Sequence, residues 1–221
     1  MAKAASARIP WNKLLTAMAR AVGEDISDAP GPLSPTGTFR LLVTTMISPR
    51  TKDEVTDAAA ERLFAVASTP AEMAALPEKR IATLIYPAGF YRVKARAIRS
   101  AAMVIRDKHQ SRVPASIDGL LELPGVGRKI ANLVLSRGFA VDAICVDTHV
   151  HRISNRTGWV RTKSPGETEA ALNEVLPVRY WRTINEMLVT FGKRVCTPLS
   201  PRCSSCPIRT HCPRVGVTKS R

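Results

Sequence analysis

Apolar residues recur at helical spacing along much of this chain. In the clearest stretch, the apolar positions fall at i, i+3, i+4, i+7 and i+8, which places on one helical face the residues Phe39, Leu42, Val43, Met46 and Ile47. The alternation of apolar and polar residues that is typical of half-buried strands is scarce. The spacing therefore predicts an all-α protein in which this segment is a buried helix.

Further helices are predicted on the same grounds. Pro49 ends the first helix, and the polar turn 48–53 separates it from the next one. The other predicted helical segments are 11–22, 54–66, 70–76, 78–85, 93–109, 117–122, 128–139, 147–157, 165–175 and 180–195. The connections between them are about as long as loops between packed helices usually are.

The stretch around the predicted helix 93–109 carries an apolar and a basic stripe. Its apolar stripe consists of Val93, Ala97 and Val104, and its basic stripe consists of Arg92, Arg96 and Arg99. A basic stripe of this kind can lie along phosphates or simply face solvent. The sequence leaves both interpretations open.

The chain is strongly basic, with a net charge of +15 over 221 residues. Because 45% of its residues are apolar, it has enough hydrophobic side chains for a core, and the charge points to a polyanionic partner such as nucleic acid, or to a merely solubilising surface. The best apolar stretch is interrupted at Arg40, so we expect no membrane span. The N-terminus lacks the apolar core of a secretory signal, which favours a reducing cytoplasmic compartment.

The segment from Leu123 to Lys129, Leu-Pro-Gly-Val-Gly-Arg-Lys, joins two predicted helices. Glycine tolerates positive φ and lacks a side chain, so Gly125, Val126 and Gly127 can expose successive backbone N–H groups where the next helix begins. Such a turn can bind a phosphate, and Arg128 would add positive charge. A plain turn between two helices is the alternative interpretation.

Two residues near this turn are candidates for catalysis. Lys129 lies at the margin between the apolar positions Ile130 and Val134 and a polar stripe that includes Asn132. If this margin lines a cleft, burial and the positive end of the helix would favour a neutral, nucleophilic amine. Asp147 ends an apolar run before another predicted helix, so it can cap that helix, handle protons in a reaction, or do both.

Four cysteines near the C-terminus are spaced as a metal site. The pattern C-x6-C-x2-C-x5-C comprises Cys196, Cys203, Cys206 and Cys212. In a reducing compartment these residues are better explained as metal ligands than as disulfides. The spacing alone does not separate zinc from an iron–sulfur cluster. Cys145 lies outside the pattern and is expected to be a buried thiol.

The three motifs together resemble the endonuclease III family of helix-hairpin-helix DNA glycosylases. The resemblance covers about residues 35–213 and rests on the Leu123–Lys129 segment, Val146-Asp-Thr-His149 and the cysteine array. It implies two helical domains that flank a DNA-binding cleft, with a [4Fe–4S] cluster on the four cysteines. The implied domains are a helical barrel with the hairpin, 31–141, and a cluster domain made of 1–30 and 142–221.

The resemblance also implies roles for individual residues. Lys129 would attack C1′ of a damaged nucleotide that has been flipped out of the duplex, and Asp147 would assist. Lys193 and Arg194, beside the cluster loop, would meet the DNA backbone, and His149 would face the base pocket. The family usually has a glutamine where this chain has Arg50 and a leucine where it has Phe90. We expect Arg50 to fill the gap left by the flipped base and Phe90 to act as an aromatic wedge.

These observations predict a bifunctional DNA glycosylase and abasic-site lyase. It would remove oxidised pyrimidines from duplex DNA and cut the abasic site by β-elimination, as a monomer associated with the nucleoid. A mismatch thymine or uracil glycosylase of the same fold is one rival hypothesis, and a non-catalytic DNA-binding protein is another. The basic tail 216–221 is expected to fray.

Overall fold

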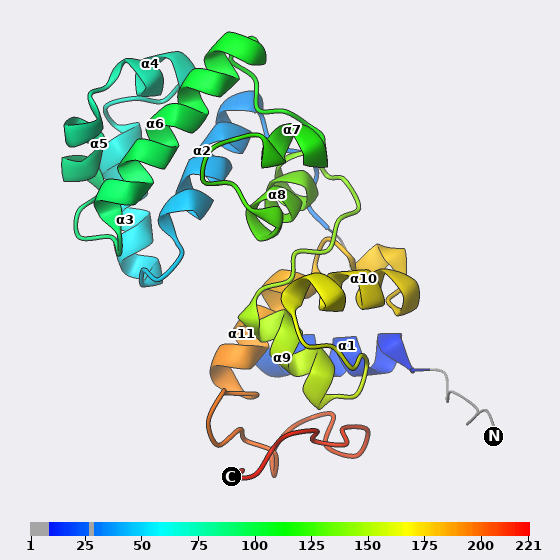
Figure 1. Ribbon diagram of the computed structural model, residues 1–221. Helices are drawn as coiled ribbons and strands as arrows, with labels where there is room; N and C mark the ends of the chain where they lie inside the picture. The colour runs from blue at the N-terminus through cyan, green and yellow to red at the C-terminus, as the bar shows by residue number, and fades with distance from the viewer. Residues whose placement is uncertain (1–8, 27–28) are drawn as a thin grey trace. The chain divides into compact units, whose positions relative to one another are not determined.

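The computed structural model describes residues 9–26 and 29–221, and every regular element within these residues is helical (Figure 1). This confirms the all-α prediction. No helix in the same residues combines the length and the apolar character needed to cross a bilayer. The elements are α1 (Trp11–Val22), α2 (Pro35–Ile47), α3 (Asp53–Phe64), α4 (Pro70–Ala75), α5 (Glu78–Ile85), α6 (Tyr91–Lys108), α7 (Ile117–Leu121), α8 (Arg128–Leu133), the π-helical turn η1 (Val134–Gly138), α9 (Thr148–Arg156), α10 (Pro165–Val175), the 3₁₀ turn η2 (Val178–Tyr180) and α11 (Ile184–Arg194).

The chain divides into two compact units. The central unit is the continuous stretch Pro30–Ala143, and the terminal unit combines the N-terminal segment up to Ala29 with Ile144–Arg221. Each unit encloses a hydrophobic core of its own. The central unit contains α2 to η1, and the terminal unit contains α1 and α9 to α11.

Helix α2 is the middle element of the central unit. It packs against α3, α6, α8 and η1, and all five apolar residues predicted to form its core face are buried. The helix begins at Pro35, before the predicted start at Phe39. Ser34 explains the earlier start, because its Oγ accepts a hydrogen bond of 3.1 Å from the Gly37 N–H and Pro35 is suited to the first helical position.

Helix α6 buries a different face from the apolar stripe expected from the sequence. Its buried residues are Ala95, Ile98, Ala101, Ala102 and Ile105, whereas Val93 is 67% exposed. The small alanines allow α4 and α5 to pack closely against this face. Arg99 on the basic stripe donates to the Leu76 carbonyl at 3.0 Å, and Arg96 lies 3.5 Å from the Glu78 carboxylate. Arg96 and Arg99 of the basic stripe thus interact with other residues of the central unit.

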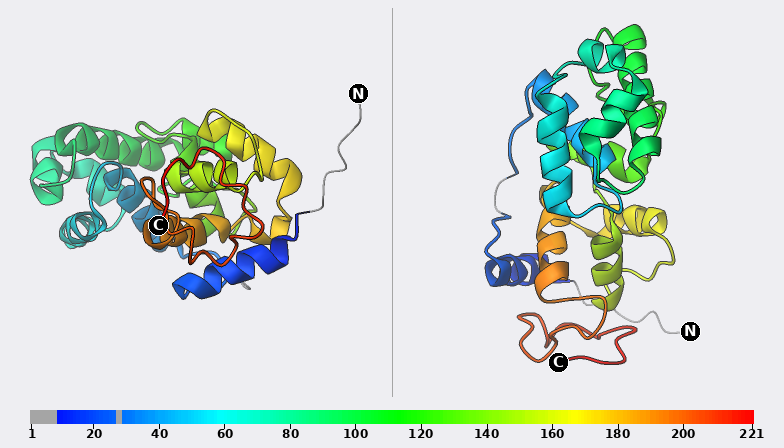
Figure 2. Two further views of the ribbon diagram at one scale, coloured as in Figure 1. Left: turned by 90° about the horizontal axis from the view of Figure 1, so that it is seen from below. Right: turned by 90° about the vertical axis from the view of Figure 1, so that its left-hand side faces the viewer.

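The terminal unit is built around α11, which packs against both α1 and α9. Trp11 of α1 meets Trp159 edge to face, with ring centroids 4.9 Å apart. Helix α11 begins at Ile184 instead of the predicted Tyr180, because the chain first makes the separate turn η2. The C-terminal loop, orange to red in Figure 2, lies at the end of α9 and α11.

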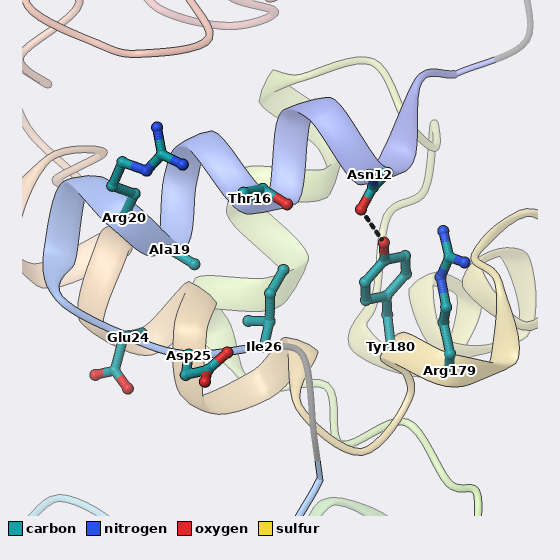
Figure 3. Close-up of a pocket in the computed structure, with 9 residues that line it drawn as sticks. All are labelled: Asn12, Thr16, Ala19, Arg20, Glu24, Asp25, Ile26, Arg179 and Tyr180. Carbon is teal, nitrogen blue, oxygen red and sulfur yellow. Dashed lines mark hydrogen bonds between the residues drawn. The ribbon is translucent and has the colours of Figure 1, made fainter.

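An open hollow of about 500 Å³ lies beside α1 in the terminal unit. Figure 3 shows Tyr180 reaching α1, where its hydroxyl donates to Asn12 Oδ1 at 3.1 Å. The hollow is lined by Asn12, Thr16, Ala19, Arg20, Glu24, Asp25, Ile26, Arg179 and Tyr180. This lining includes none of the residues that the sequence nominates for function, so the hydrogen bond serves to fasten α1 to the unit.

Candidate active site and cysteine cluster

The predicted hairpin is formed by α7, a tight turn and α8. Gly125 adopts a positive φ of 81°, and the Val126 N–H donates to the Leu123 carbonyl at 3.0 Å. A Cβ on Gly125 would lie 2.7 Å from the Ala97 Cβ on α6, so the turn packs directly on that helix. Gly127 precedes α8 without any side-chain cap. The hairpin therefore requires glycine at position 125 for both conformation and space.

Replacing Gly125 with alanine is expected to lower the free energy of unfolding by about 1–3 kcal/mol, because the new Cβ adds strain and a clash. Gly127→Ala is the matched control. Position 127 has a φ of −97°, and a Cβ added there would meet no heavy atom within 4 Å. Its effect should stay within about 1 kcal/mol. Urea denaturation of both variants tests this, and equal destabilisation would contradict it.

Lys129 is half-buried and lines a polar hollow of about 370 Å³ in the central unit. The other lining residues come from α2, α3, the turn between them and α8, and they are Thr44, Thr45, Ser48, Asp53, Thr56, Asp57 and Leu133. Asn132 and Ser136, which the sequence placed in a polar stripe beside Lys129, are buried. The amine therefore belongs to a cavity rich in hydroxyl and carboxylate groups.

The two aspartates of this hollow were not singled out by sequence reasoning. Asp53 falls in the predicted turn 48–53 and Asp57 in the predicted helix 54–66, whereas the structure places both on α3, four residues apart and on one face. That spacing is the signal that could have nominated them. The sequence could not show that this face meets Lys129, because the two segments are separated by most of the central unit.

A second hollow of about 340 Å³ in the central unit brings together three of the predicted DNA-contacting residues. Arg50, Phe90 and Gly125 all line it. Both Arg50 and Phe90 are exposed, and the Arg50 guanidinium carbon lies 5.5 Å from the centroid of the Phe90 ring. Arg128 is also exposed. The side chain of Val126 is buried, so only its backbone remains available to a ligand.

Asp147 caps α9, which is one of the two roles that the sequence predicts for it. Its Oδ1 accepts hydrogen bonds from the backbone N–H groups of His149 and Val150, at 2.8 and 2.9 Å. The residue is half-buried. Cys145, which precedes it, is 1% exposed, in agreement with the prediction of a buried thiol. The cap fixes the carboxylate at the N-terminal end of α9.

Arg152 connects the start of α9 to the first cysteine of the array. Its guanidinium lies 3.1 Å from His149 Nδ1 and donates to the carbonyls of Gly192 and Cys196, at 3.1 and 2.9 Å. Burial lowers the pKa of this guanidinium. A Cβ on Gly192 would lie 2.3 Å from His149 Nδ1, so only glycine allows this approach. His149 is thus held from two sides within the terminal unit.

The four cysteines of the array line one small cavity in the terminal unit. Burial raises the pKa of the Cys206 and Cys212 thiols. The guanidinium of Arg156 donates to Cys196 Sγ at 3.6 Å and to the carbonyls of Thr197 and Pro198, at 2.7 and 2.6 Å. A set of four thiols that converge on one cavity, with a guanidinium beside one of them, suits a thiolate-ligated metal centre.

The basic residues near the array differ in their surroundings. Lys193 and Arg194 are exposed on the last turn of α11, but Arg194 also donates to the Val22 carbonyl at 2.9 Å.

The prediction that the tail 216–221 frays is wrong. Arg221 donates through its N–H to the Pro201 carbonyl at 2.9 Å and accepts from the Ser204 N–H at 3.1 Å. These hydrogen bonds tie the C-terminus to the cysteine loop.

Comparison with protein families identifies the group to which this architecture belongs. The model of the HhH-GPD superfamily base excision DNA repair proteins matches residues 43–178, which is more than half of the chain. The chain belongs to the HhH-GPD superfamily. The matched residues include the hairpin, Lys129 and Asp147, while the cysteine array follows them.

Individual members of the superfamily are closely similar to this chain. Endonuclease III of Thermotoga maritima is 48% identical over 177 residues, which cover 80% of this chain and 83% of that protein. Endonuclease III of Bacillus subtilis is 37% identical over 175 residues, which cover 79% and 80% of the two chains. The resemblance to endonuclease III that the motifs suggested is therefore confirmed.

Two of the similar solved structures agree with the fold. A trapped covalent intermediate of endonuclease III with DNA, an estranged-adenine complex, superposes with a TM-score of 0.83 at 34% identity, and the match covers 97% of both chains. A thermostable thymine-DNA glycosylase superposes with a TM-score of 0.77 at 22% identity, with 90% of this chain and 94% of that chain covered. The second likeness concerns the fold alone.

Proposed function

We propose that this member of the HhH-GPD superfamily is a bifunctional DNA glycosylase and abasic-site lyase that acts on oxidised pyrimidines in duplex DNA. The observation that carries the proposal is Lys129, a primary amine at the start of α8, directly after the hairpin turn, that lines a polar hollow. The resemblance to endonuclease III implies this role for Lys129. The relative whose covalent intermediate with DNA was trapped supports the same chemistry.

The proposed reaction begins when the neutral Lys129 amine attacks C1′ of the damaged nucleotide. The bond between C1′ and the base breaks, and the base leaves with the electron pair and takes up a proton. The amine nitrogen loses its protons as the sugar ring opens to an imine on C1′. Removal of a C2′ proton then expels the 3′ phosphate, which cuts the strand by β-elimination.

We assign to Asp147 the stabilisation of positive charge on the sugar and the handling of the protons that this sequence of steps releases. Its carboxylate is fixed by two backbone N–H groups at the start of α9, so it requires little reorganisation during the reaction. His149, held by Arg152, is proposed to contact the extruded base. The DNA contacts are assigned to the hairpin backbone at 125–127, Arg128, Lys193 and Arg194.

Arg50 and Phe90 are proposed to enter the duplex at the position of the extruded nucleotide. Phe90 is 60% exposed, and an aromatic ring of this size can stack between bases. The guanidinium of Arg50 carries several donors for the acceptors of an unpaired base. The net charge of +15 supports association with DNA, and we propose that the protein is cytoplasmic and nucleoid-associated.

A second candidate function is a mismatch thymine or uracil DNA glycosylase. Arg50 favours it, because the departure from glutamine at this position changes the hydrogen-bonding groups offered to the opposite base. Release of thymine from a G·T duplex, compared with release of thymine glycol from a matched duplex, separates the two candidates. We expect the oxidised base to be released faster.

We propose that Cys196, Cys203, Cys206 and Cys212 hold a [4Fe–4S] cluster. The donor set fits, since four cysteine thiols line one cavity and Arg156 donates to one of the sulfurs. When bound, such a cluster supplies four iron–thiolate bonds that brace the loop from Cys196 to Cys212. Zinc also accepts four cysteine ligands and is the alternative metal. Metal analysis of the purified protein distinguishes zinc from an iron–sulfur cluster.

Cys203→Ser is expected to reduce the iron content of the purified protein to near zero. Because metal-binding free energy contributes to folding, its Tm should fall by roughly 10 °C or more. Cys145→Ala is the matched control, because this buried cysteine lies outside the cavity, and it should retain its iron. Iron and sulfide analysis with thermal denaturation checks both. Four iron atoms retained in Cys203→Ser, or zinc in the wild type, would contradict the assignment.

The proposed function is tested with the wild-type protein and a duplex that carries one thymine glycol. Sodium borohydride added during turnover reduces an imine to a stable amine, so we expect a covalent protein–DNA adduct on a denaturing gel. Without borohydride we expect release of the free base and a cut strand. A protein that binds the duplex but gives neither adduct nor base release is the non-catalytic DNA-binding protein, and this result would refute the proposal.

A further inference from the structure

Two exposed residues of the central unit have a strained backbone and touch each other. Arg50 has a φ of 54° and Phe90 a φ of 57°, which lie in the left-handed region that residues with a Cβ seldom adopt. They follow different helices, yet the Arg50 guanidinium stacks over the Phe90 ring. Such strain persists only where the surroundings determine the conformation, and it clusters at functional sites.

The side chain of Lys94 donates three hydrogen bonds to the loop that carries Arg50 and to the end of α2. Its Nζ donates to the carbonyls of Ile47 and Pro49, at 2.5 and 2.7 Å, and to Thr51 Oγ1 at 2.9 Å. An ammonium group has three N–H donors, so all three have an acceptor. Ile47 is the last residue of α2, where a positive charge is favoured by the helix dipole.

The loop that carries Phe90 is attached to the same point. The Gly89 N–H donates to Thr51 Oγ1 at 3.1 Å, so this hydroxyl joins Gly89 to Lys94. A Cβ on Gly89 would lie 2.4 Å from the Arg50 carbonyl oxygen, which leaves no room for any other residue. Lys94 is half-buried, and burial lowers its pKa. The two loops are thus joined by hydrogen bonds through Thr51 and the half-buried Lys94.

We propose that Lys94 is a positioning residue that holds Arg50 and Phe90 stacked and ready to enter a DNA duplex at a missing or extruded base. The inference rests on the proposed function, because it takes DNA as the partner of these two side chains. Lys94 would not touch the DNA itself. Its contribution is preorganisation, since side chains ordered before binding lose less freedom when they insert.

When Arg50 and Phe90 are ordered before binding, they favour a duplex that lacks one base over an intact duplex. At an abasic site, Arg50 and Phe90 have a space to fill, whereas in an intact duplex they must first displace a base. Contacts to phosphates are the same in both cases and carry no such preference. The ratio of the affinities for abasic and intact duplexes therefore measures the contribution of Arg50 and Phe90. The affinity for the intact duplex measures the contacts between basic residues and phosphates.

The test measures that ratio by fluorescence anisotropy, with two duplexes that differ only in one tetrahydrofuran abasic site. In Lys94→Met the three N–H donors are lost while an unbranched side chain, shorter by one atom, is kept. We expect the preference for the abasic duplex to fall by about tenfold, with affinity for the intact duplex changed by less than about twofold. Lys94→Arg, which keeps N–H donors, should recover part of the preference. Lys79→Met, at an exposed lysine of α5, is the matched control and should leave the ratio unchanged.

Gly89→Ala provides an independent route to the same answer. The added methyl pushes on the Arg50 carbonyl without removing any donor of Lys94, so it should also lower the ratio. 2-Aminopurine placed opposite the abasic site adds a spectroscopic readout, because its fluorescence changes when an aromatic side chain inserts beside it. We expect the wild-type change in fluorescence to be lost in Lys94→Met and kept in Lys79→Met.

An unchanged ratio in Lys94→Met and Gly89→Ala would overturn the proposal. An equal loss of affinity for both duplexes would also overturn it, since this outcome marks a purely structural lysine. If Lys94→Met does not fold, the ratios of Lys94→Arg and Gly89→Ala decide the question in the same way. Failure of the proposed function is distinguishable, because it appears as a missing borohydride adduct in a wild-type protein that still prefers the abasic duplex.

Discussion

Lys129→Ala should give no borohydride adduct with DNA that carries a damaged base, and its rate of strand cutting should fall by roughly 10³-fold or more. The physical reason is that the covalent intermediate needs an uncharged primary amine, and the described residues that line the hollow around position 129 include no other lysine. The substitution should change the free energy of unfolding by no more than about 1 kcal/mol, because the side chain is half-buried and lines a polar hollow.

Lys129→Arg separates nucleophilic attack from simple attraction to phosphate. Arginine keeps the positive charge, but its guanidinium stays protonated and does not form the imine. We expect this variant to bind damaged duplex with nearly wild-type affinity and to give no adduct. Lys79→Ala, at an exposed lysine of the same unit, serves as the control and should form the adduct normally. An adduct of undiminished yield in Lys129→Ala would show that another amine reacts.

Asp147→Asn should lower the rate of base release by roughly 10²-fold or more while it leaves the fold intact. Asparagine retains a side-chain oxygen that can accept the hydrogen bonds from the N–H groups of His149 and Val150, so the cap on α9 is preserved. It lacks the negative charge that the proposed mechanism requires. Single-turnover kinetics and urea denaturation of the same preparation measure the two effects.

Asp147→Ala removes the charge and the cap together. We expect the same loss of rate as in Asp147→Asn, with an additional loss of about 1 kcal/mol in the free energy of unfolding. The comparison matters because capping and catalysis are both plausible roles for an aspartate at this position. If Asp147→Asn turned over like the wild type, the residue would be a cap alone, and the proton-handling role would have to be reassigned.

Local features were predicted well from the sequence. The core face of α2, the hairpin turn with its glycines and the capping aspartate of α9 each depend on residues only a few positions apart, so their spacing carries the information. The burial of Cys145 followed from the apolar run around it. The convergence of the four cysteines on one cavity likewise agrees with their short spacing near the C-terminus.

Features that depend on distant segments were predicted poorly. The apolar stripe expected on α6 differs from its buried face, because an alanine-rich helix presents more than one face suited to packing and only the neighbouring α4 and α5 decide between them. The sequence left Arg99 open to phosphate contact, whereas in the fold its guanidinium donates to the Leu76 carbonyl. The tail 216–221 was predicted wrongly for a similar reason, since the hydrogen-bonding partners of Arg221 lie in the cysteine loop.

The sequence by itself determined the helical class, the superfamily motifs and the residue types available for chemistry, because helical periodicity, turn formation and ligand spacing are properties of neighbouring residues. Only the tertiary structure decided that Asp53 and Asp57 share a hollow with Lys129, and that Lys94 joins the loops of Arg50 and Phe90. These groupings arise when helices pack and bring separated segments into contact. The helical periodicity of a segment does not show which other helices that segment will contact.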